Sequence, residues 1–285
     1  MAIKNRNRSI NQIFQNVCIF ETYSKKLLAI IMKKKVVIPL PSYGFDPTEA
    51  AIPWKILSDN NIETVFATPN GKKAQADIRM LTGKGLGIFL PLLKADKSAV
   101  KIYKEMEQST EFNNPIKYDE IDENYFDGIH LTGGHDKGVI EYLESKILQN
   151  KIVGFFNRKK TVGAVCHGVL LAARSMDNKT GKSVLYDYKT TSLLKKQELL
   201  AYYLTKLWLK DYYLTYPETT VEDEVKKYLA SPSRFIQGPI PFFRDSIDNQ
   251  RYGFYVQDNN YISARWPGDI HAFSLALLKN LRQKS

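Results

Sequence analysis

The sequence predicts an α/β fold in which a parallel sheet is covered by helices on both faces. From Lys35 onward, short runs of β-branched residues alternate with segments of helical spacing, a pattern typical of such sheets. The order strand, turn, helix repeats along the chain. Its 285 residues, 44% of them hydrophobic, are enough for one large domain with a full core.

The first strand is expected over residues 36–40, where Val and Ile predominate. A loop rich in Pro, Gly and Asp follows it, and residues 48–60 then have the spacing of a helix. A second strand is expected over residues 62–68. This part of the chain therefore forms one complete strand, helix, strand unit.

The same order returns in the middle of the chain. A buried strand over residues 128–132 ends at two glycines, and a helix over about 139–149 follows. A further strand, the central one of the sheet, is expected over 161–165, with a helix over 169–175 after it. Each strand is thus followed by a sharp turn at the same edge of the sheet.

Regularity weakens after Gly181. The segment 186–216 is crowded with Tyr and Trp at mixed spacings, which indicates a helical subdomain that buries these rings or, alternatively, a lid over an active site. Residues 252–256 and 261–265 resemble the two strands of a hairpin. An amphipathic helix over 269–281 is expected to end the fold.

The formal net charge of the chain is +11. Part of this charge lies before Met32, and the remaining basic residues are scattered rather than arranged in a stripe. Pairs such as Lys159-Lys160 are isolated, and no recognisable module interleaves aromatic stacking residues with Lys and Arg. We therefore expect no nucleic-acid partner.

Cysteine usage indicates a reducing compartment. Only Cys18 and Cys166 occur, so no disulfide framework is expected, and we predict a cytoplasmic protein. The apolar stretch 27–32 is too short for a signal-peptide core or a membrane span, and we expect no membrane association. Residues 1–31 are predicted to be a flexible extension or a misassigned start, and residues 32–285 a single domain.

Cys166 stands where the strand over 161–165 meets the next helix. This is the position of a nucleophile elbow, which would expose the sulfur above the sheet. The positive end of the following helix favours the thiolate, and backbone N–H groups there can hold a developing oxyanion. A buried structural cysteine is the alternative. His167 is expected near the thiolate from the first helical turn, or else as a surface or packing residue.

Asp46-Pro47-Thr48-Glu49 starts the first helix. The conventional interpretation is a capping box, with Asp46 as N-cap, Pro47 at the first helical position and Glu49 closing the box. In the functional interpretation, Glu49 points across to Cys166, hydrogen-bonds the sulfur and moves protons. Apolar neighbours would raise its pKa.

Gly133-Gly134-His135 follows the strand over 128–132. A tight turn explains the glycines, but an N–H at the carboxyl edge of the sheet is also where an oxyanion donor belongs. Glu49, Gly134 and Cys166 all follow predicted strands at that edge. This convergence is stronger evidence for a site than any one of the three residues.

With these motifs the sequence resembles the ThiJ/PfpI family of the class I glutamine amidotransferase-like superfamily. That group includes the parkinsonism-associated deglycase and the bacterial heat-shock glyoxalase. The resemblance rests on Glu49, on the turn Gly133-Gly134-His135 and on Ala164-Val165-Cys166-His167-Gly168. It extends from about Lys33 to Ser175 and resumes in the C-terminal helix.

The resemblance implies a flavodoxin-like sandwich, a homodimer, and no cofactor or metal. It implies Cys166 as nucleophile, Glu49 as proton partner, and the N–H groups of Gly134 and His167 as oxyanion donors, within a binding turn that includes Gly133 and His135. The implied substrates are small reactive carbonyls, as in glyoxalase III or deglycase chemistry. The thiolate would add to a 2-oxoaldehyde such as methylglyoxal, and proton transfer by Glu49 or His167 would give the 2-hydroxy acid.

The sequence departs from the family between Gly181 and Gly238, where the aromatic-rich segment indicates an insertion at about 182–238. This leaves the exact substrate and the third member of any Cys-His-acid triad open. An amidotransferase would need a glutamate beside the late histidine, and His271 has none. A cysteine-type α/β-hydrolase could use His271, but Glu49 and the double-glycine turn would then be unexplained.

A different class of function is also compatible with the motifs. The reactive Cys166 would serve a redox sensor that forms a sulfenic or sulfinic acid. Exposed apolar surface in the aromatic-rich segment would instead favour a holdase chaperone. In both cases the chain would be a non-enzymatic stress protein, and saturable aldehyde turnover would separate it from an enzyme.

Overall fold

The computed structural model describes residues 33–283, so the predicted extension 1–31 and Cys18 lie outside the described residues. From Lys35 on, the chain forms a seven-stranded sheet in the order β10-β11-β7-β6-β1-β3-β5. Its strands are β1 (Lys35–Pro39), β3 (Glu63–Thr68), β5 (Ile116–Lys117), β6 (Gly128–Leu131), β7 (Thr161–Val165), β10 (Tyr255–Asp258) and β11 (Tyr261–Ala264). All neighbouring strands are parallel except the β10–β11 hairpin. The predicted α/β class is confirmed.

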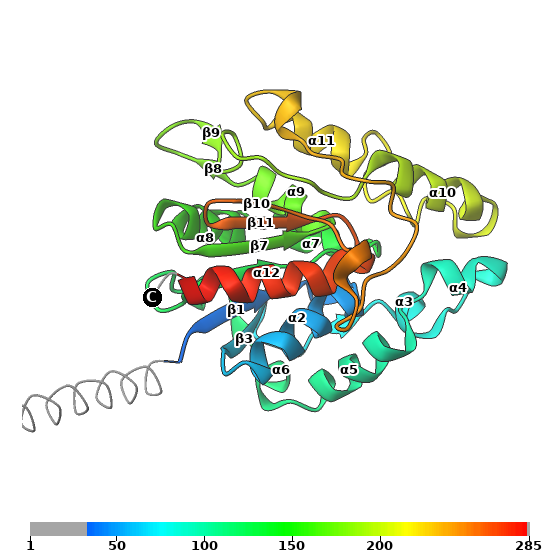
Figure 1. The fold of residues 1–285 in the computed structure, drawn as a ribbon, viewed down its shortest axis with the longest axis horizontal. Helices are drawn as coiled ribbons and strands as arrows, with labels where there is room; N and C mark the ends of the chain where they lie inside the picture. Colours follow the sequence, from blue (N-terminus) through cyan, green and yellow to red (C-terminus); the bar gives the residue numbers. More distant parts are fainter. Residues whose placement is uncertain (1–32, 284–285) are drawn as a thin grey trace, which may run out of the picture. The chain divides into compact units, whose positions relative to one another are not determined.

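Helices cover both faces of this sheet (Figure 1). On one face α12 packs against α2, β7 and β11, and α2 packs in turn against α5. On the other face α9 contacts α7 and α8, and α8 and α9 contact the strands β6 and β7. The helices are α2 (Pro47–Asp59), α3 (Ile78–Thr82), α4 (Leu90–Leu93), α5 (Lys97–Glu107), α6 (Thr110–Asn113), α7 (Val139–Glu144), α8 (Lys146–Asn157), α9 (His167–Ala173), α10 (Lys195–Leu209), α11 (Val221–Lys227) and α12 (Ile270–Gln283).

Shorter elements complete the chain. Two small sheets pair β2 (Tyr43–Phe45) with β4 (Gln75–Ala76) in parallel, and β8 (Met176–Asp177) with β9 (Lys182–Ser183) antiparallel. The 3-10 turns are η1 (Gly87–Phe89), η2 (Tyr118–Glu120), η3 (Pro232–Arg234), η4 (Gln250–Tyr252) and η5 (Pro267–Asp269).

The central strands are buried along their whole length. Every residue of β6 and of β7 is buried, which explains why these segments have continuous rather than alternating apolar sequences. Their parallel register brings the carboxyl ends of β1, β6 and β7 to one edge of the sheet. The turns that follow these strands therefore meet there, as predicted.

The single helix predicted over 139–149 is wrong, because the segment forms two helices. Ser145 has extended backbone angles, and its hydroxyl accepts the Leu148 N–H at 3.3 Å, so that it caps α8. Helix α5 is a further difference, since no helix was predicted over its residues. Its buried residues Ala99, Tyr103 and Met106 have the i, i+4, i+7 spacing of one helical face, a signal that was present in the sequence.

The aromatic-rich segment is only partly helical. The helix α10 leaves Tyr203 and Trp208 largely exposed, at 58% and 45%. The rings that are buried, Tyr212 and Tyr213, belong to the turn after the helix. The expected helical subdomain that buries the Tyr and Trp rings is therefore not what forms, and the insertion over 182–238 itself stays a prediction.

Candidate active site

Cys166 occupies the turn between β7 and α9. Its backbone angles, φ +56° and ψ −122°, are rare for an L residue, and its N–H donates to Ala264 O at 3.1 Å. This is the strained elbow that the sequence predicted. The prediction that the elbow exposes the sulfur is wrong, however, because Cys166 is only 1% exposed. The residue lies at the carboxyl edge of the sheet, but it is covered.

Glu49 reaches the same place from the first turn of α2. The Asp46 carboxylate accepts the N–H groups of Thr48 and Glu49, at 2.8 and 3.1 Å, so the predicted N-cap is confirmed. The capping box is not formed. The Glu49 side chain instead accepts the Gly133 N–H at 2.7 Å, while the Asp46 N–H donates to Gly133 O. Glu49 is thus turned toward the glycine turn, as the functional interpretation required.

Burial determines the charge of Glu49. The residue is fully buried, and this raises the pKa of its carboxyl well above the ordinary value. The carboxyl group therefore keeps its proton more readily than an exposed glutamate would. Its second oxygen, Oε1, is buried without an oxygen or nitrogen partner.

Gly133 lies at the point where groups of Glu49, Cys166 and His167 meet. A Cβ atom at this position would lie 2.8 Å from each of three atoms: Cys166 Cβ, Glu49 Oε2 and the backbone N of His167. Only a residue without a side chain leaves room for this approach. The strand-end turn thus lets a carboxyl group, a thiol and a backbone N–H group converge on one point.

The ring of His167 completes the arrangement. Its Nδ1 lies 3.4 Å from Cys166 Sγ, and its Nε2 lies 2.9 Å from the hydroxyl of Thr215. Burial lowers the pKa of His167 well below the ordinary value, so the ring is neutral. Thr215 follows α10 and was missed by the sequence analysis, since no spacing or motif marks it.

The predicted thiolate is not the resting state. Burial raises the pKa of Cys166 well above the ordinary thiol value, and the Glu49 carboxylate contributes in the same direction. The His167 N–H at the helix N-terminus lowers the pKa of Cys166, but α9 has only seven residues and desolvation outweighs it. The sulfur is therefore a thiol until a substrate or a base takes its proton.

His135 and Tyr213 lie over this centre. The His135 ring stands edge-on to His167, with centroids 5.1 Å apart, and contacts Tyr213 at 4.9 Å. Burial lowers the pKa of His135 to about 4, so it is also neutral. Lys137 fixes the turn that carries Tyr213, because its ammonium group donates to Leu214 O at 2.7 Å. These contacts favour the alternative of a lid formed by this part of the chain.

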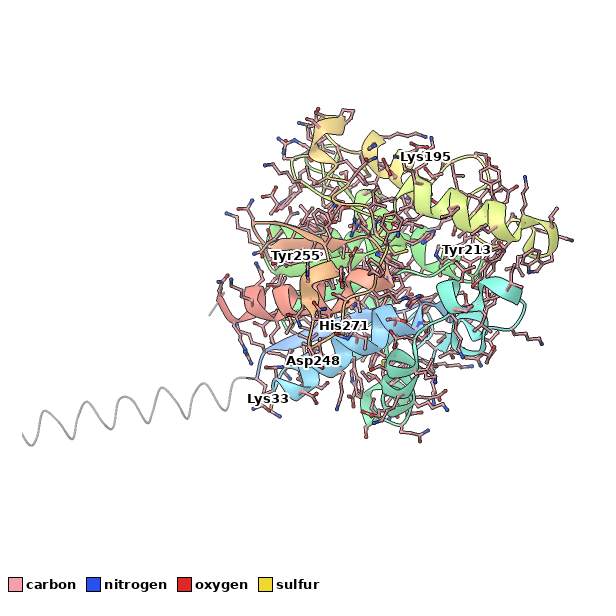
Figure 2. The ribbon with its side chains drawn as sticks, turned by 45° about the vertical axis from the view of Figure 1, so that its right-hand side comes forward. Lys33, Lys195, Tyr213, Asp248, Tyr255 and His271 are labelled. Carbon is pink, nitrogen blue, oxygen red and sulfur yellow. The ribbon has the colours of Figure 1, made fainter. Side chains whose placement is uncertain are left out.

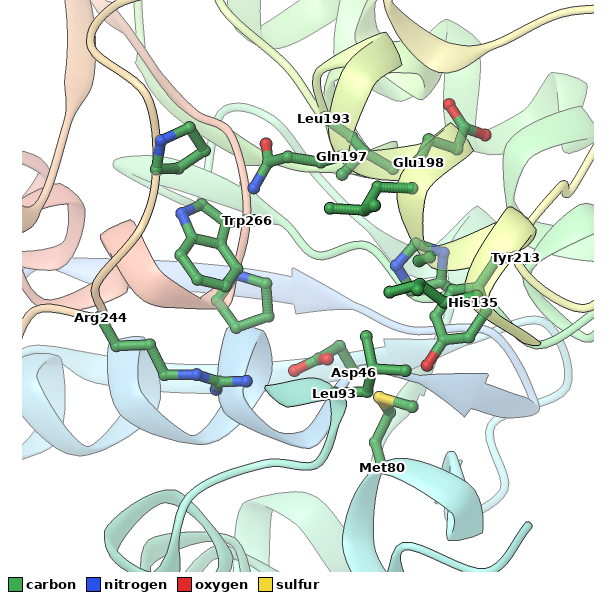
Figure 3. A pocket seen from close by; sticks show the side chains of 15 residues that line it. Asp46, Met80, Leu93, His135, Leu193, Gln197, Glu198, Tyr213, Arg244 and Trp266 are labelled. Carbon is green, nitrogen blue, oxygen red and sulfur yellow. The ribbon is translucent and has the colours of Figure 1, made fainter. Parts of the chain in front are cut away.

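A pocket of about 130 Å³ borders the centre through Asp46 and His135 (Figure 3). Cys166 is not part of its wall. Its walls are mostly apolar, and Figure 3 shows the Arg244 guanidinium directed toward the Asp46 carboxylate. The lining residues are Asp46, Met80, Leu93, His135, Leu193, Gln197, Glu198, Leu200, Ala201, Leu204, Tyr213, Pro241, Arg244, Trp266 and Pro267.

His271 does not take part in the centre. Its Nδ1 bonds the Asp245 carboxylate at 3.0 Å at the start of α12, and Figure 2 shows it well apart from Tyr213. The α/β-hydrolase alternative, in which His271 activates the cysteine, is therefore not supported. Within residues 33–283, no group of three or more His, Cys, Asp or Glu side chains is placed to hold a metal ion. Over the same range, no helix has the length and apolar character needed to cross a bilayer.

Comparison with known proteins places the chain among its relatives. It is 27% identical to the Schizosaccharomyces pombe protein C14C4.04 over 157 residues, which make up 52% of this chain and 57% of that protein. It is 24% identical to C18G6.12c of the same organism over 261 residues, covering 84% and 75% of the two chains.

Among solved structures, glyoxalase III from Candida albicans is similar in fold, with a TM-score of 0.65 at 19% identity, over 87% of this chain and 97% of that one. Drosophila melanogaster DJ-1beta has a TM-score of 0.50 at 13% identity, over 88% and 95% of the two chains. The family model described as ThiJ/PfpI family-like matches residues 40–232. The chain therefore belongs to the ThiJ/PfpI family.

Proposed function

We propose that this chain is a cysteine-dependent enzyme that converts small 2-oxoaldehydes to 2-hydroxy acids without a cofactor. The observation that carries the proposal is the convergence of the Cys166 thiol, the Glu49 carboxyl group and the neutral His167 ring at one elbow of the sheet. Each component can hold or move a proton. The fold shared with a protein described as glyoxalase III supports this class of reaction.

The first step is addition of sulfur to the aldehyde. If the Thr215 hydroxyl accepts the Nε2–H of His167, the lone pair of Nδ1 faces the sulfur at 3.4 Å. The neutral ring then takes the thiol proton as the C–S bond forms. The backbone N–H of His167 is available to the developing oxyanion, and a hemithioacetal results.

The second step moves one proton between adjacent carbons. The proton on the hemithioacetal carbon is removed, and C2 receives a proton, which gives the thioester of the 2-hydroxy acid without net oxidation. Glu49 suits both halves of this transfer. As a carboxylate it takes the proton from the hemithioacetal carbon, and as the carboxylic acid it delivers a proton to C2, through an Oε1 that has no oxygen or nitrogen partner. Burial raises the pKa of Glu49 and so helps it to hold the proton between the two events. Water then hydrolyses the thioester and restores the thiol, so that aldehyde plus water becomes hydroxy acid.

The proposal is tested by lactate formation from methylglyoxal in the absence of glutathione. We expect turnover by the wild type and a loss of at least about 100-fold in Cys166→Ala and in Glu49→Gln. Asp59→Asn, at the exposed end of the same helix, is the matched control and should keep full activity. An inactive wild type, or an active Cys166→Ala variant, would refute the proposal.

A second candidate, a holdase chaperone, is favoured by one surface feature. Ile240, Phe242 and Phe243 are 74%, 74% and 62% exposed on the segment before β10. Suppression of aggregation by the Cys166→Ala variant at wild-type level would support this function. The redox-sensor alternative is less favoured, since the sulfur is 1% exposed and its pKa is raised.

A further inference from the structure

We infer that the pocket beside His135 binds the ring of a hydroxyaryl 2-oxoaldehyde, with the phenolic group held between Gln197 and Trp266. This inference rests on the proposed function and specifies its substrate class. It concerns the wall residues of the pocket, and none of the groups that take part in the chemistry.

The pocket has the size and the surface for one aromatic ring. Its volume is about 130 Å³. A cavity of about 150 Å³ lined by aliphatic and aromatic side chains binds benzene in another protein. Most of the walls here are also apolar, with Leu193, Ala201 and Leu204 from the α10 region facing Met80 and Leu93. Methylglyoxal, which has a single methyl group, would leave this surface unused.

Gln197 and Trp266 each contribute a polar atom without a partner. Gln197 Oε1 and Trp266 Nε1 are both buried, and neither makes a hydrogen bond. Figure 3 shows the Gln197 side chain near the Trp266 ring. A buried polar group without a partner costs about 1–3 kcal/mol. A phenolic hydroxyl can donate to Gln197 Oε1 and accept from Trp266 Nε1, so one group of the ligand would satisfy both atoms.

The charges in the pocket favour a neutral ligand. Burial raises the pKa of the Asp46 carboxyl, and the positive charge of Arg244, which Asp46 faces, offsets part of this effect. Arg244 also donates to Lys94 O at 3.0 Å, and the Glu198 carboxyl group accepts the Val221 N–H at 2.9 Å. The acidic and basic groups are thus engaged with the protein. A carboxylate on the ring would meet Asp46 as well as Arg244.

His135 connects the pocket with the thiol. It lines the pocket, its Nδ1 is buried without a partner, and its ring contacts that of His167. The dicarbonyl end of the substrate would therefore lie at His135 while the ring extends toward Gln197 and Trp266. The reaction is that of the proposed function: 4-hydroxyphenylglyoxal and water give 4-hydroxymandelate.

The test compares kcat/KM for 4-hydroxyphenylglyoxal, phenylglyoxal and methylglyoxal. For the wild type we expect this order, from highest to lowest. Trp266→Phe and Gln197→Leu should each lower kcat/KM for the hydroxylated substrate about tenfold, the effect of one lost hydrogen bond, and leave methylglyoxal within twofold. Trp208→Phe, an exposed position outside the pocket wall, is the control and should change none of the three.

Binding to Cys166→Ala separates this inference from the proposed function. The probe is 4-hydroxyacetophenone, which has the ring and hydroxyl but no aldehyde. Calorimetric binding that Trp266→Phe and Gln197→Leu weaken about tenfold supports the pocket even if no aldehyde is turned over. Turnover of methylglyoxal with no binding of the probe, or with equal preference for all three aldehydes, would overturn the inference and leave the proposed function intact.

Discussion

Cys166 has a backbone conformation that costs free energy. A non-glycine residue at φ +56° and ψ −122° is strained by about 1–3 kcal/mol, and here the surrounding sheet and helix maintain it. The strain places the sulfur beside both Glu49 and His167. The strained backbone thus lowers the stability of the fold but holds the sulfur in place, which is common in nucleophile turns.

Replacing Cys166 by glycine should therefore relieve the strain. We expect Cys166→Gly to have a free energy of unfolding about 1 kcal/mol higher than Cys166→Ala, because both lack the sulfur but only glycine adopts this conformation freely. Urea denaturation of the two variants measures the difference. Equal stabilities would mean that the turn relaxes without the cysteine.

Gly133→Ala should damage the site. The added Cβ would lie 2.8 Å from Glu49 Oε2 and from two atoms of the elbow, so the groups must move apart. Because displacement of reacting groups by about 1 Å can cost about 100-fold in rate, we expect a loss of that order in kcat.

Gly181→Ala is the control for this variant. Gly181 has φ +67° and no atom within 4 Å of an added Cβ. It should lose about 1 kcal/mol of stability through backbone strain but keep wild-type kcat. Equal activities of Gly133→Ala and Gly181→Ala would show that the reacting groups do not depend on the space left at Gly133.

At the scale of elements, α10 and α11 lie on either side of the turn that carries Tyr213 and Thr215. The buried Glu198 of α10 accepts the first N–H of α11, that of Val221, at 2.9 Å. Arg174 of α9 bonds both the Glu224 carboxylate of α11 and the Tyr216 hydroxyl. Thr215 is therefore held against His167 by helices on both sides of its turn.

Glu198 makes this arrangement sensitive to pH. Burial raises its pKa to about 8 from 4.5, so the folded state binds more protons than the unfolded state between these values. Stability should fall as pH rises through this window, and Glu198→Gln should remove the effect. From pH 5 to 8, we expect the free energy of unfolding of Glu198→Gln to rise relative to that of the wild type by about 1 kcal/mol per pH unit. Thermal unfolding at several pH values measures this difference.

Glu222→Gln on α11 is the matched variant of opposite sign. Hydrogen bonds from Lys226 and other donors lower the pKa of Glu222 in spite of its burial. The native Glu222 carboxylate therefore adds stability above the pKa that this group has in the unfolded chain. As pH rises, the free energy of unfolding of Glu222→Gln should decrease relative to that of the wild type. The same trend in both variants would contradict the assignment.

At the scale of the whole molecule, Arg265 joins distant parts of the chain. It follows β11, is fully buried and pairs with Asp269 at 2.8 Å, while it also donates to the carbonyl groups of Gln237 and Pro239. Asp269 accepts the Phe254 N–H in turn. This pair fastens the segment that carries the pocket residue Arg244 to the start of α12.

Removal of one partner should leave the other as a buried, unpaired charge. We expect Arg265→Met to lower the free energy of unfolding by about 3 kcal/mol, and Arg265→Met/Asp269→Asn to recover part of that loss. Denaturant titration measures the free energies of unfolding of the wild type and of both variants. A double variant less stable than the single one would show that the carbonyl contacts of Arg265 dominate.

The predicted homodimer stays a prediction. Sedimentation at several concentrations tests it, and Phe242→Asp on the exposed apolar segment examines whether this surface takes part. The predicted cytoplasmic location likewise remains a prediction.

The sequence alone determined most strands of the main sheet and the position of the candidate site. Runs such as 161–165 are apolar throughout, which parallel strands buried on both faces require, and the turns after parallel strands meet at one edge. The sequence therefore predicts that Glu49, the turn at Gly133 and Cys166 lie at one edge of the sheet. Their resemblance to the ThiJ/PfpI family gave the same grouping.

Only the tertiary structure decided which partners these residues have. Thr215 reaches His167 through a long irregular connection, and such a contact has no local periodicity to reveal it. The burial of Cys166 depends on side chains from remote segments, which is why the expected exposed thiolate is a covered thiol. The Glu49 side chain likewise accepts the Gly133 N–H instead of capping its own helix. This donor comes from the end of a strand that is distant in the sequence, so local capping rules do not predict the contact.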